Sequence, residues 1–254
     1  MNNNILYLGD TALDNAAAYL AGVMQHAEFP FDYLPSNQRV SAEMLEEARP
    51  LYILSDYPSV NFTADCQQRL LEHVQSGSGL IMFGGWESFH GMGGDWNGSP
   101  IAEALPVEIA NSDDRVNCDH PVLLWKKCEH EILAGLPWDD RPPVIGGFNR
   151  VSAKPEATVL LEAKHIAVRR EEEAFRFETD GSDPLLVVGT YGKGRAAAMM
   201  TDVAPHWVGP LVDWGDARVN AQATGAEEIE VGDWYAQFFR QLIDWTRAKS
   251  EQAV

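Results

Sequence analysis

Leu80-Ile-Met-Phe-Gly-Gly-Trp-Glu-Ser-Phe-His-Gly-Met-Gly-Gly-Asp-Trp-Asn-Gly-Ser-Pro100 is an apolar run that leads directly into a glycine-rich and aromatic-rich loop. The first four residues are all apolar, which is typical of a central strand of a parallel sheet that is covered on both faces. Gly84 and Gly85 allow a sharp turn after this strand. Because ligands of such sheets bind beyond the carboxyl ends of the strands, the loop is the predicted site.

The residues before this stretch alternate short apolar runs with helical patterns, which indicates repeated β-α units and a parallel sheet. We expect strands at Ile5–Leu8, Phe31–Leu34 and Leu51–Leu54, and helices at residues 14–26, from Ser41, and from Thr63 to about Gln75. Together with the strand at residues 80–83, this density of strands and crossovers predicts a doubly wound fold.

The residues after the loop are less regular. Prolines interrupt residues 101–150, so we expect a short helix at residues 101–105 and otherwise loops and small strands. Two strands separated by little more than a turn are expected at residues 158–162 and 166–169, and the acidic run 171–173 is interpreted as a solvated turn. The apolar runs 184–189 and 195–200 predict a hairpin, and residues 234–247 predict a final helix.

The length and the 45% apolar content allow one large α/β domain or two small ones, and we favour a single domain over residues 1–254; the formal net charge is -19. This negative charge argues against nucleic-acid or membrane partners. The sequence shows no signal peptide and no apolar run long enough to span a membrane. Cys66, Cys118 and Cys128 match no zinc or disulfide pattern, so we expect a cytoplasmic protein.

Several motifs follow one another in a recognisable order: Phe83–Phe89, Gly91–Gly94, Ser99–Val107, Ile132–Pro137, Gly146–Asn149, and Tyr191–Gly194 followed by Asp202–Trp207. In this order they resemble the putative glutamine amidotransferase family of bacterial proteins, a branch of the class I glutamine amidotransferase-like superfamily. The resemblance covers most of the chain. It implies a flavodoxin-like three-layer sandwich with a mostly parallel central sheet, to which this chain adds a β-hairpin region.

The working enzymes of this superfamily use a cysteine on a tight strand-to-helix turn, a histidine after a late strand, and a glutamate two residues beyond it. In this chain Trp86 stands at the position of the cysteine, His206 matches the histidine, and Val208 stands in place of the acid. An indole cannot attack a carboxamide carbon. The resemblance therefore implies the fold without glutaminase activity, and the expected role is binding of a small polar ligand at the strand carboxyl ends.

A hydrolase or lyase on the same scaffold is the first alternative. Ser88 could act as nucleophile with His206 as base and Asp202 as acid, because a serine needs an adjacent imidazole that is oriented by a carboxylate. Glu87 could carry out acid-base chemistry if apolar neighbours raise its pKa. The simpler interpretations, a capping serine and an exposed loop glutamate, stay open. The candidate catalytic residues are thus Glu87, Ser88 and His206.

Aromatic and polar side chains of the loop and of the segment after residue 200 are the candidate ligand contacts. They are Trp86, His90, Trp96, Asp202 and Trp207. His90, Asp95, Asp202 and His206 offer metal-ligating atoms without a ligand spacing, so neither a metal nor another cofactor is expected. A second alternative is a protein-interaction module whose aromatic loop is the interface, and self-association into a homo-oligomer stays open.

Overall fold

The computed structural model describes residues 2–247, and its centre is one mixed sheet. The strand order is β2-β1-β3-β4-β11-β10-β9-β6-β7. The first five are mutually parallel: β2 (Phe31–Leu34), β1 (Ile5–Gly9), β3 (Leu51–Ser55), β4 (Gly79–Phe83) and β11 (Gly194–Met199). The other four are antiparallel to their neighbours: β10 (Ala174–Tyr191), β9 (Thr158–Glu171), β6 (Arg115–Lys126) and β7 (Val144–Asn149).

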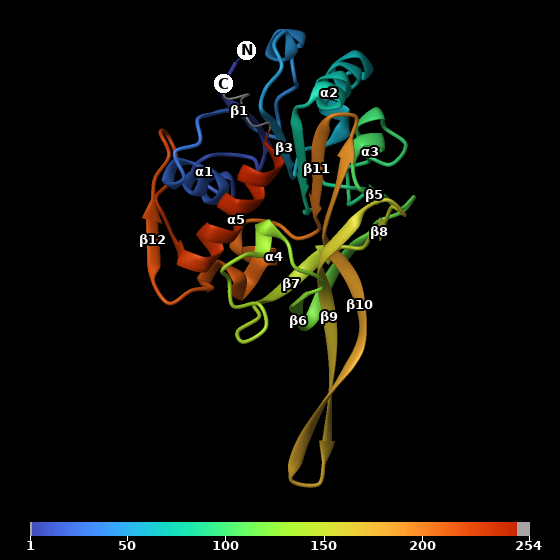
Figure 1. Cartoon of the computed structure of the whole chain (residues 1–254), viewed down its shortest axis with the longest axis vertical. Helices are drawn as coiled ribbons and strands as arrows, with labels where there is room; N and C mark the ends of the chain where they lie inside the picture. Colours follow the sequence, from blue (N-terminus) through green and yellow to red (C-terminus); the bar gives the residue numbers. More distant parts are fainter. Residues whose placement is uncertain (1, 248–254) are drawn as a thin grey trace.

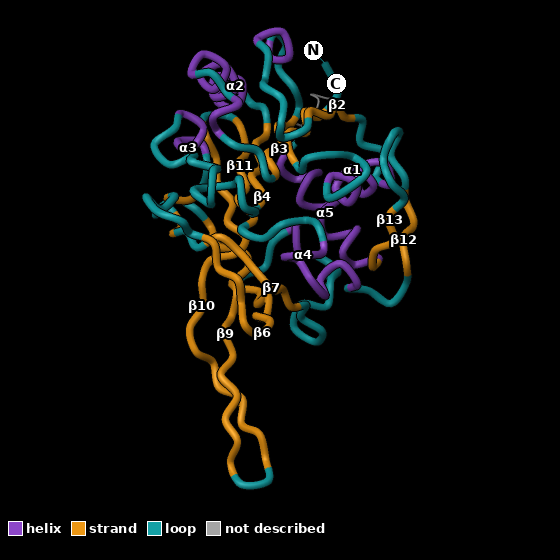
Figure 2. The backbone as a smooth tube through the Cα atoms, turned by 180° about the vertical axis from the view of Figure 1, so that it is seen from behind, coloured by secondary structure: helices purple, strands orange, loops and turns teal. Residues whose placement is uncertain are grey.

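Helices cover both faces of the parallel part of the sheet (Figures 1 and 2). One face carries α1 (Ala17–His26) and α5 (Asp233–Thr246), and the other carries α2 (Ala64–Ser76) and α3 (Pro100–Ala104). Every residue of β1, β3 and β4 is buried, as expected for parallel strands between two helical layers. The expected mixed α/β fold with a sheet that is parallel at one end is confirmed.

Most predicted elements of this part lie within a few residues of their expected bounds. Thr63 caps α2 as predicted, because its hydroxyl accepts a hydrogen bond from the Cys66 amide at 3.2 Å. The short helix expected from Ser41 is a 3-10 turn at Ala42–Leu45. The hairpin predicted around residues 190–194 joins β10 to β11, with Tyr191 paired to Gly194.

The expectation of loops and small strands at residues 101–150 was wrong for β6, which runs through twelve residues. Its pairing with β7 shifts register between Asn117 and Val122. Pro121 lies within this irregular stretch, which is where a residue without an amide hydrogen is tolerated in a sheet. Proline therefore marked a local irregularity in a long strand and did not end it.

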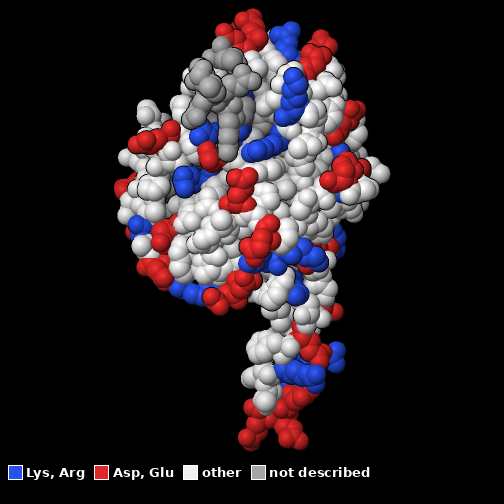
Figure 3. Space-filling model, viewed as in Figure 1, with Lys and Arg blue, Asp and Glu red and all other residues white. Residues whose placement is uncertain are grey.

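The two strands expected at residues 158–169 are one strand, β9, which pairs with β10 to form an arm that projects from the body (Figures 1 and 2). The acidic run 171–173 forms the turn at its tip, as predicted, and Figure 3 shows acidic side chains gathered there. One face of the arm exposes Val168, Phe175 and Phe177. The strands continue because cross-strand pairs and ion pairs such as Arg169–Glu178 support them outside the core.

Smaller elements complete the chain. Two-stranded sheets form from β5 (Val107–Glu108) with β8 (Ser152–Ala153), and from β12 (Arg218–Ala221) with β13 (Ile229–Gly232). A short helix, α4 (Pro205–Val208), follows β11. Within residues 2–247 no helix has both the length and the apolar character needed to cross a membrane.

The turn after β4 requires glycine. A Cβ atom on Gly84 would lie 2.2 Å from the Met200 carbonyl oxygen, whereas nothing lies within 4 Å of the corresponding position on Gly98 in the same loop. We expect Gly84→Ala to lower the free energy of unfolding by about 3 kcal/mol or more, because backbone would have to move. Gly98→Ala, with φ of 71°, should cost only about 1 kcal/mol for left-handed backbone. Urea unfolding of both variants tests this, and equal losses would contradict it.

Candidate functional site at the strand carboxyl ends

Acidic side chains follow four neighbouring strands of the parallel part of the sheet, at the point where each strand ends. Asp10 follows β1, Asp56 follows β3, Glu87 lies just beyond β4, and Asp202 lies just beyond β11. Parallel strands end at the same edge, so these side chains gather although they are far apart in the sequence. The order of the strands in the sheet therefore brings these acidic side chains together.

A cleft of about 500 Å³ opens above these strand ends. Its walls come from the segments after β1, β2, β3 and β4 and from α4. The lining residues are Asp10, Thr11, Asn15, Ala16, Ser36, Asp56, Trp86, Glu87, Met92 and His206. Most of their polar atoms are hydrogen-bond acceptors, and no lysine or arginine is among them. This lining suits a ligand that donates hydrogen bonds or carries positive charge.

Asp56 holds the loop after β4 against the loop after β3. Its Oδ1 accepts a hydrogen bond from the Glu87 amide at 2.7 Å, and its own amide donates to Ser88 Oγ at 3.0 Å. A Cβ atom on Gly85 would lie 2.1 Å from the same carboxylate. Asp56 thus needs the glycine beside it, and it fixes the position of Glu87 at the cleft.

Asn149, at the end of β7, ties the same loop to the antiparallel half. Its Oδ1 accepts from the Gly85 amide at 2.9 Å, and its Nδ2 donates to Asp114 Oδ1 at 2.8 Å. The Asp114 carboxylate also accepts from the amides of His90 and Gly91, both at 3.0 Å. Asn149 and Asp114 are buried, so this network is a rigid internal support for the loop.

Asp202 and His206 form the other side of the site. Asp202 is fully buried, and its Oδ1 accepts hydrogen bonds from the amides of Val203 and Ala204 at the start of α4. Its Oδ2 lies 2.9 Å from Nε2 of His206, whose side chain is 52% exposed. The imidazole is therefore held at the cleft by a buried carboxylate.

Burial and mutual repulsion change the protonation of this group. Burial, followed by the charge of Asp202, raises the pKa of Asp56 to about 7. The same two causes raise the pKa of Asp10 well above its ordinary range, and burial raises the pKa of Glu87. The contact with Asp202 raises the pKa of His206, because a negative neighbour favours the imidazolium. Shifts of this kind are typical of functional sites.

The turn after β4 differs from the strand-to-helix turn that a cysteine nucleophile needs. Residues 84–99 form turns, and α3 begins only at Pro100. The amides that could stabilise an oxyanion are already used: Gly84 donates to Met199 and Thr201, Gly85 to Asn149, and Glu87 to Asp56. Trp86 stands at the expected nucleophile position and is 43% exposed at the wall of the cleft. Arg115 lies 4.3 Å from its ring centroid on the antiparallel side of the loop.

The structure brings some of the predicted site residues together and separates others. Trp86, Glu87 and His206 line the cleft, and Asp202 supports it. Ser88 is buried beneath the loop and does not line the cleft.

Three other candidates are placed away from the cleft. Trp96 is fully buried, with its indole N–H donated to the Tyr57 carbonyl at 2.9 Å. Trp207 is 3% exposed and donates to Asn117 Oδ1 at 2.8 Å. The His90 side chain is 22% exposed, and its Nε2 lies 3.9 Å from Asp95. Both indoles are buried and hydrogen-bonded internally, so the structure places Trp96 and Trp207 away from the cleft that Trp86 lines.

Sequence reasoning missed Asp10, Asp56, Asp114 and Asn149. The signal for the first two was present, because each directly follows a predicted apolar strand of the parallel sheet. Their joint position depends on β1 and β3 being neighbours. No sequence pattern links Asp114 to Asn149, since that pair forms only when β7 returns beside the loop.

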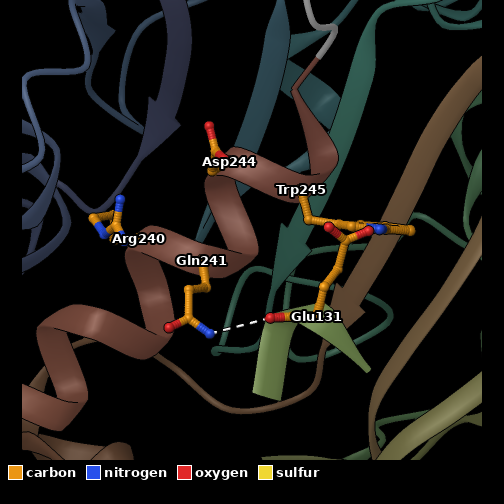
Figure 4. A pocket seen from close by; sticks show the side chains of 5 residues that line it. All are labelled: Glu131, Arg240, Gln241, Asp244 and Trp245. Atoms are coloured by element: carbon orange, nitrogen blue, oxygen red, sulfur yellow. Dashed lines mark hydrogen bonds between the residues drawn. The ribbon is translucent and has the colours of Figure 1, made fainter. Parts of the chain in front are cut away.

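A second, smaller hollow lies on α5, about 70 Å³ in volume and lined by Glu131, Arg240, Gln241, Asp244 and Trp245. Figure 4 shows the Gln241 side chain reaching toward Glu131. Its Nε2 donates to the carbonyl oxygens of residues 131, 132 and 134. These bonds fasten the turn at Glu131–Leu133 to α5, so the hollow is explained as a structural contact.

The large mixed sheet, parallel at one end, and the acidic side chains beyond its parallel strands define an α/β fold with a cleft at the strand carboxyl ends. A family model described as putative glutamine amidotransferase matches residues 7–221. The chain belongs to this family, as the sequence motifs predicted. Among curated proteins, none matches the chain.

Solved structures share the fold over nearly the whole chain. Cytoplasmic Protein STM1381 from Salmonella typhimurium LT2 is 25% identical, with a TM-score of 0.73, and the match covers 96% of this chain and 99% of that one. Cytoplasmic Protein STM3548 from Salmonella typhimurium is 21% identical, with a TM-score of 0.72 and coverage of 97% and 100%. A cold-adapted β-galactosidase from Rahnella sp. R3 is 11% identical, with a TM-score of 0.53, and the match covers 96% of this chain and 31% of that enzyme.

Replacing the Asp56 carboxylate should stabilise the protein at alkaline pH. Its pKa is about 7 in the folded chain against 3.8 ordinarily, so the folded state keeps a proton that unfolding releases. Stability should therefore fall as pH rises from about 4 to about 7 and not fall further above that range. We expect Asp56→Asn, which can still accept from the Glu87 amide, to raise the free energy of unfolding at pH 8 by on the order of 2 kcal/mol.

The difference between wild type and Asp56→Asn should be small at pH 4. Urea unfolding at pH 4, 6 and 8, without divalent cations, measures it. Asp95→Asn is the control, because this carboxylate of the same loop is 65% exposed. A variant that is less stable than wild type at pH 8 would refute the assignment.

Proposed function

We propose that this chain is a glutamine amidotransferase-like domain that binds a small polar ligand at the strand carboxyl ends and does not hydrolyse glutamine. The observation that carries the proposal is the cleft itself, in which Asp10, Asp56, Glu87 and His206 surround a space beside Trp86. The parallel strands have the order of flavodoxin-like folds, whose ligands bind at this edge. The continuous sheet through both halves supports a single domain over residues 1–254.

The chemistry of the lining narrows the ligand. Carboxylates accept hydrogen bonds and attract positive charge, and the exposed Trp86 indole can stack on a flat or sugar-like face. We therefore favour a polyhydroxyl or amino compound of metabolite size. The similarity to two proteins described as cytoplasmic supports a cytoplasmic location.

A hydrolase or lyase is the second candidate, because His206 is paired with Asp202 and Glu87 lines the same cleft. An imidazole held by a carboxylate, with a second acid within the same cleft, can move protons to and from a substrate. Ser88 is the weakest member of this alternative, since its Oγ accepts a hydrogen bond from the Asp56 amide. The two candidates share the cleft and differ in whether a bond breaks there.

Glutamine should not be hydrolysed. No cysteine lines the cleft: Cys66 is buried in α2, Cys118 lies in β6, and Cys128 follows that strand. We expect ammonia release from glutamine by the purified chain to equal that of a sample without protein. Ammonia release that is abolished by replacing any one of the three cysteines with serine would overturn this part of the proposal.

A metabolite that occupies the cleft should raise the melting temperature, because it binds only the folded chain. At a ligand concentration of about 100 times Kd the gain is about 2.7 kcal/mol. We expect a sugar, polyol or amine to produce this shift in wild type, and Trp86→Ala and Glu87→Gln to lose it.

Trp125→Ala is the matched control, since Trp125 is 39% exposed and lies under Lys164 at 4.0 Å, much as Trp86 lies under Arg115. A shift that is lost equally in Trp125→Ala would place the ligand elsewhere. The screen is run in EDTA, so that cations do not contribute to it. Turnover of a hit that is lost in His206→Ala would favour the hydrolase or lyase.

A further inference from the structure

We propose that Asp56, Asp202 and His206 bind a divalent transition-metal cation, Mn²⁺ or Zn²⁺, in the cleft, with Asp10 accepting a hydrogen bond from a water on that cation. The inference deepens the proposed function, since it concerns the same cleft and rests on the ligand site being there. It departs from the sequence-based expectation of no metal, which weighed His90, Asp95, Asp202 and His206 and did not include Asp56.

The first support is geometric. One ligand atom from each of Asp56, Asp202 and His206 lies within 4.8 Å of the others. Ligands on opposite sides of one cation are about 4.2 Å apart at a metal–ligand distance of about 2.1 Å. The three atoms must therefore draw closer, by side-chain rotation, when a cation binds. The three residues come from two strand ends and a short helix, so the fold sets their spacing.

The second support is a pair of buried carboxylate oxygens with few donors around them, Asp10 Oδ1 beside the Ser55 hydroxyl and Asp202 Oδ2 beside His206. Asp10 is 2% exposed and lines the cleft, and its Oδ1 has no hydrogen-bond partner, while Oδ2 accepts from Tyr7. Asp202 is fully buried, and its Oδ2 has only the ion pair with His206. Buried carboxylate oxygens are normally hydrogen-bonded, paired with a cation or bound to a metal. Asp10 lines the cleft, and Asp202 contacts the lining residue His206, which points to a cationic occupant.

The charges at the site agree with this. Asp10, Asp56 and Asp202 bring three carboxyl groups together, and no lysine or arginine lines the cleft to balance their charge when they are ionised. A divalent cation supplies the missing positive charge from the solvent side. It would leave open coordination positions toward Glu87 and Trp86, where the ligand of the proposed function lies.

The donor set selects the kind of cation. An imidazole together with carboxylates suits Mn²⁺ or Zn²⁺, whereas Ca²⁺ takes six to eight oxygen ligands and Mg²⁺ keeps several waters with few carboxylates. His90 and Asp95 offer the same two chemical groups on the same loop. They are only a pair, at 3.9 Å, and lie outside the cluster, so they serve as a control.

The test is titration of the untagged, EDTA-dialysed full chain with MnCl₂ and with ZnCl₂, followed by calorimetry and melting temperature. We expect one saturable site in wild type. His206→Gln and Asp56→Asn should weaken binding by at least about tenfold, and His90→Gln should leave it unchanged. Asp56→Asn is expected to fold at least as stably as wild type at pH 8, so a loss there cannot come from unfolding. Water-proton relaxation by bound Mn²⁺ gives an independent readout of an open coordination position.

Absence of saturable binding by wild type at millimolar cation, or binding that is equal in His206→Gln and wild type, would overturn the metal site. A metabolite that raises the melting temperature in EDTA together with such a negative result would leave the proposed function standing. Cation binding by wild type, together with no metabolite that raises the melting temperature, would support the metal site and count against the proposed function.

Discussion

The hydrogen bonds of Asn149 fix the loop after β4 against the antiparallel half of the sheet. The amide bridges the Gly85 backbone and the Asp114 carboxylate, and Asp114 in turn binds two amides of the loop. These groups are buried, so losing one would leave several polar atoms without partners. The antiparallel strands are thereby fastened to the loop after β4, and Glu87 and Trp86 take their positions from that attachment.

Function and stability oppose each other at the strand ends. Asp10, Asp56 and Asp202 repel one another in surroundings that exclude water, and their local partners are backbone amides, Tyr7 and one histidine. Such an arrangement weakens the folded state unless something positive joins it. Gly85 in the loop after β4 adds to this constraint, because only a residue without a side chain lets the backbone approach the Asp56 carboxylate so closely. The strand ends, where these carboxyl groups are crowded, are therefore the part of the fold that gains most from binding a positively charged partner.

The turn after β4 is where this chain departs from the sequence pattern of the working enzymes of its superfamily. The chain has the sheet of a glutamine amidotransferase-like protein, and its histidine after β11 is paired with an acid. The turn after β4, however, has a tryptophan in place of a nucleophile and no helix directly behind it. Its amides are bonded to Asn149, Asp56 and neighbouring strands. A shared fold has been kept while the means of activating a carboxamide are absent from this turn.

Sequence alone determined the parallel strands, most helix bounds and the edge where a site should lie, because burial on both faces and helical periodicity are local patterns. Trp86, Glu87 and His206, which the sequence singled out, line the cleft at this edge. Only the tertiary structure decided that Asp10 and Asp56 join them, that Trp96 and Trp207 are internal, and that β9 is one long strand. Those facts depend on which strands become neighbours. Strand order is set by packing between segments that are distant in sequence, and no local pattern records it.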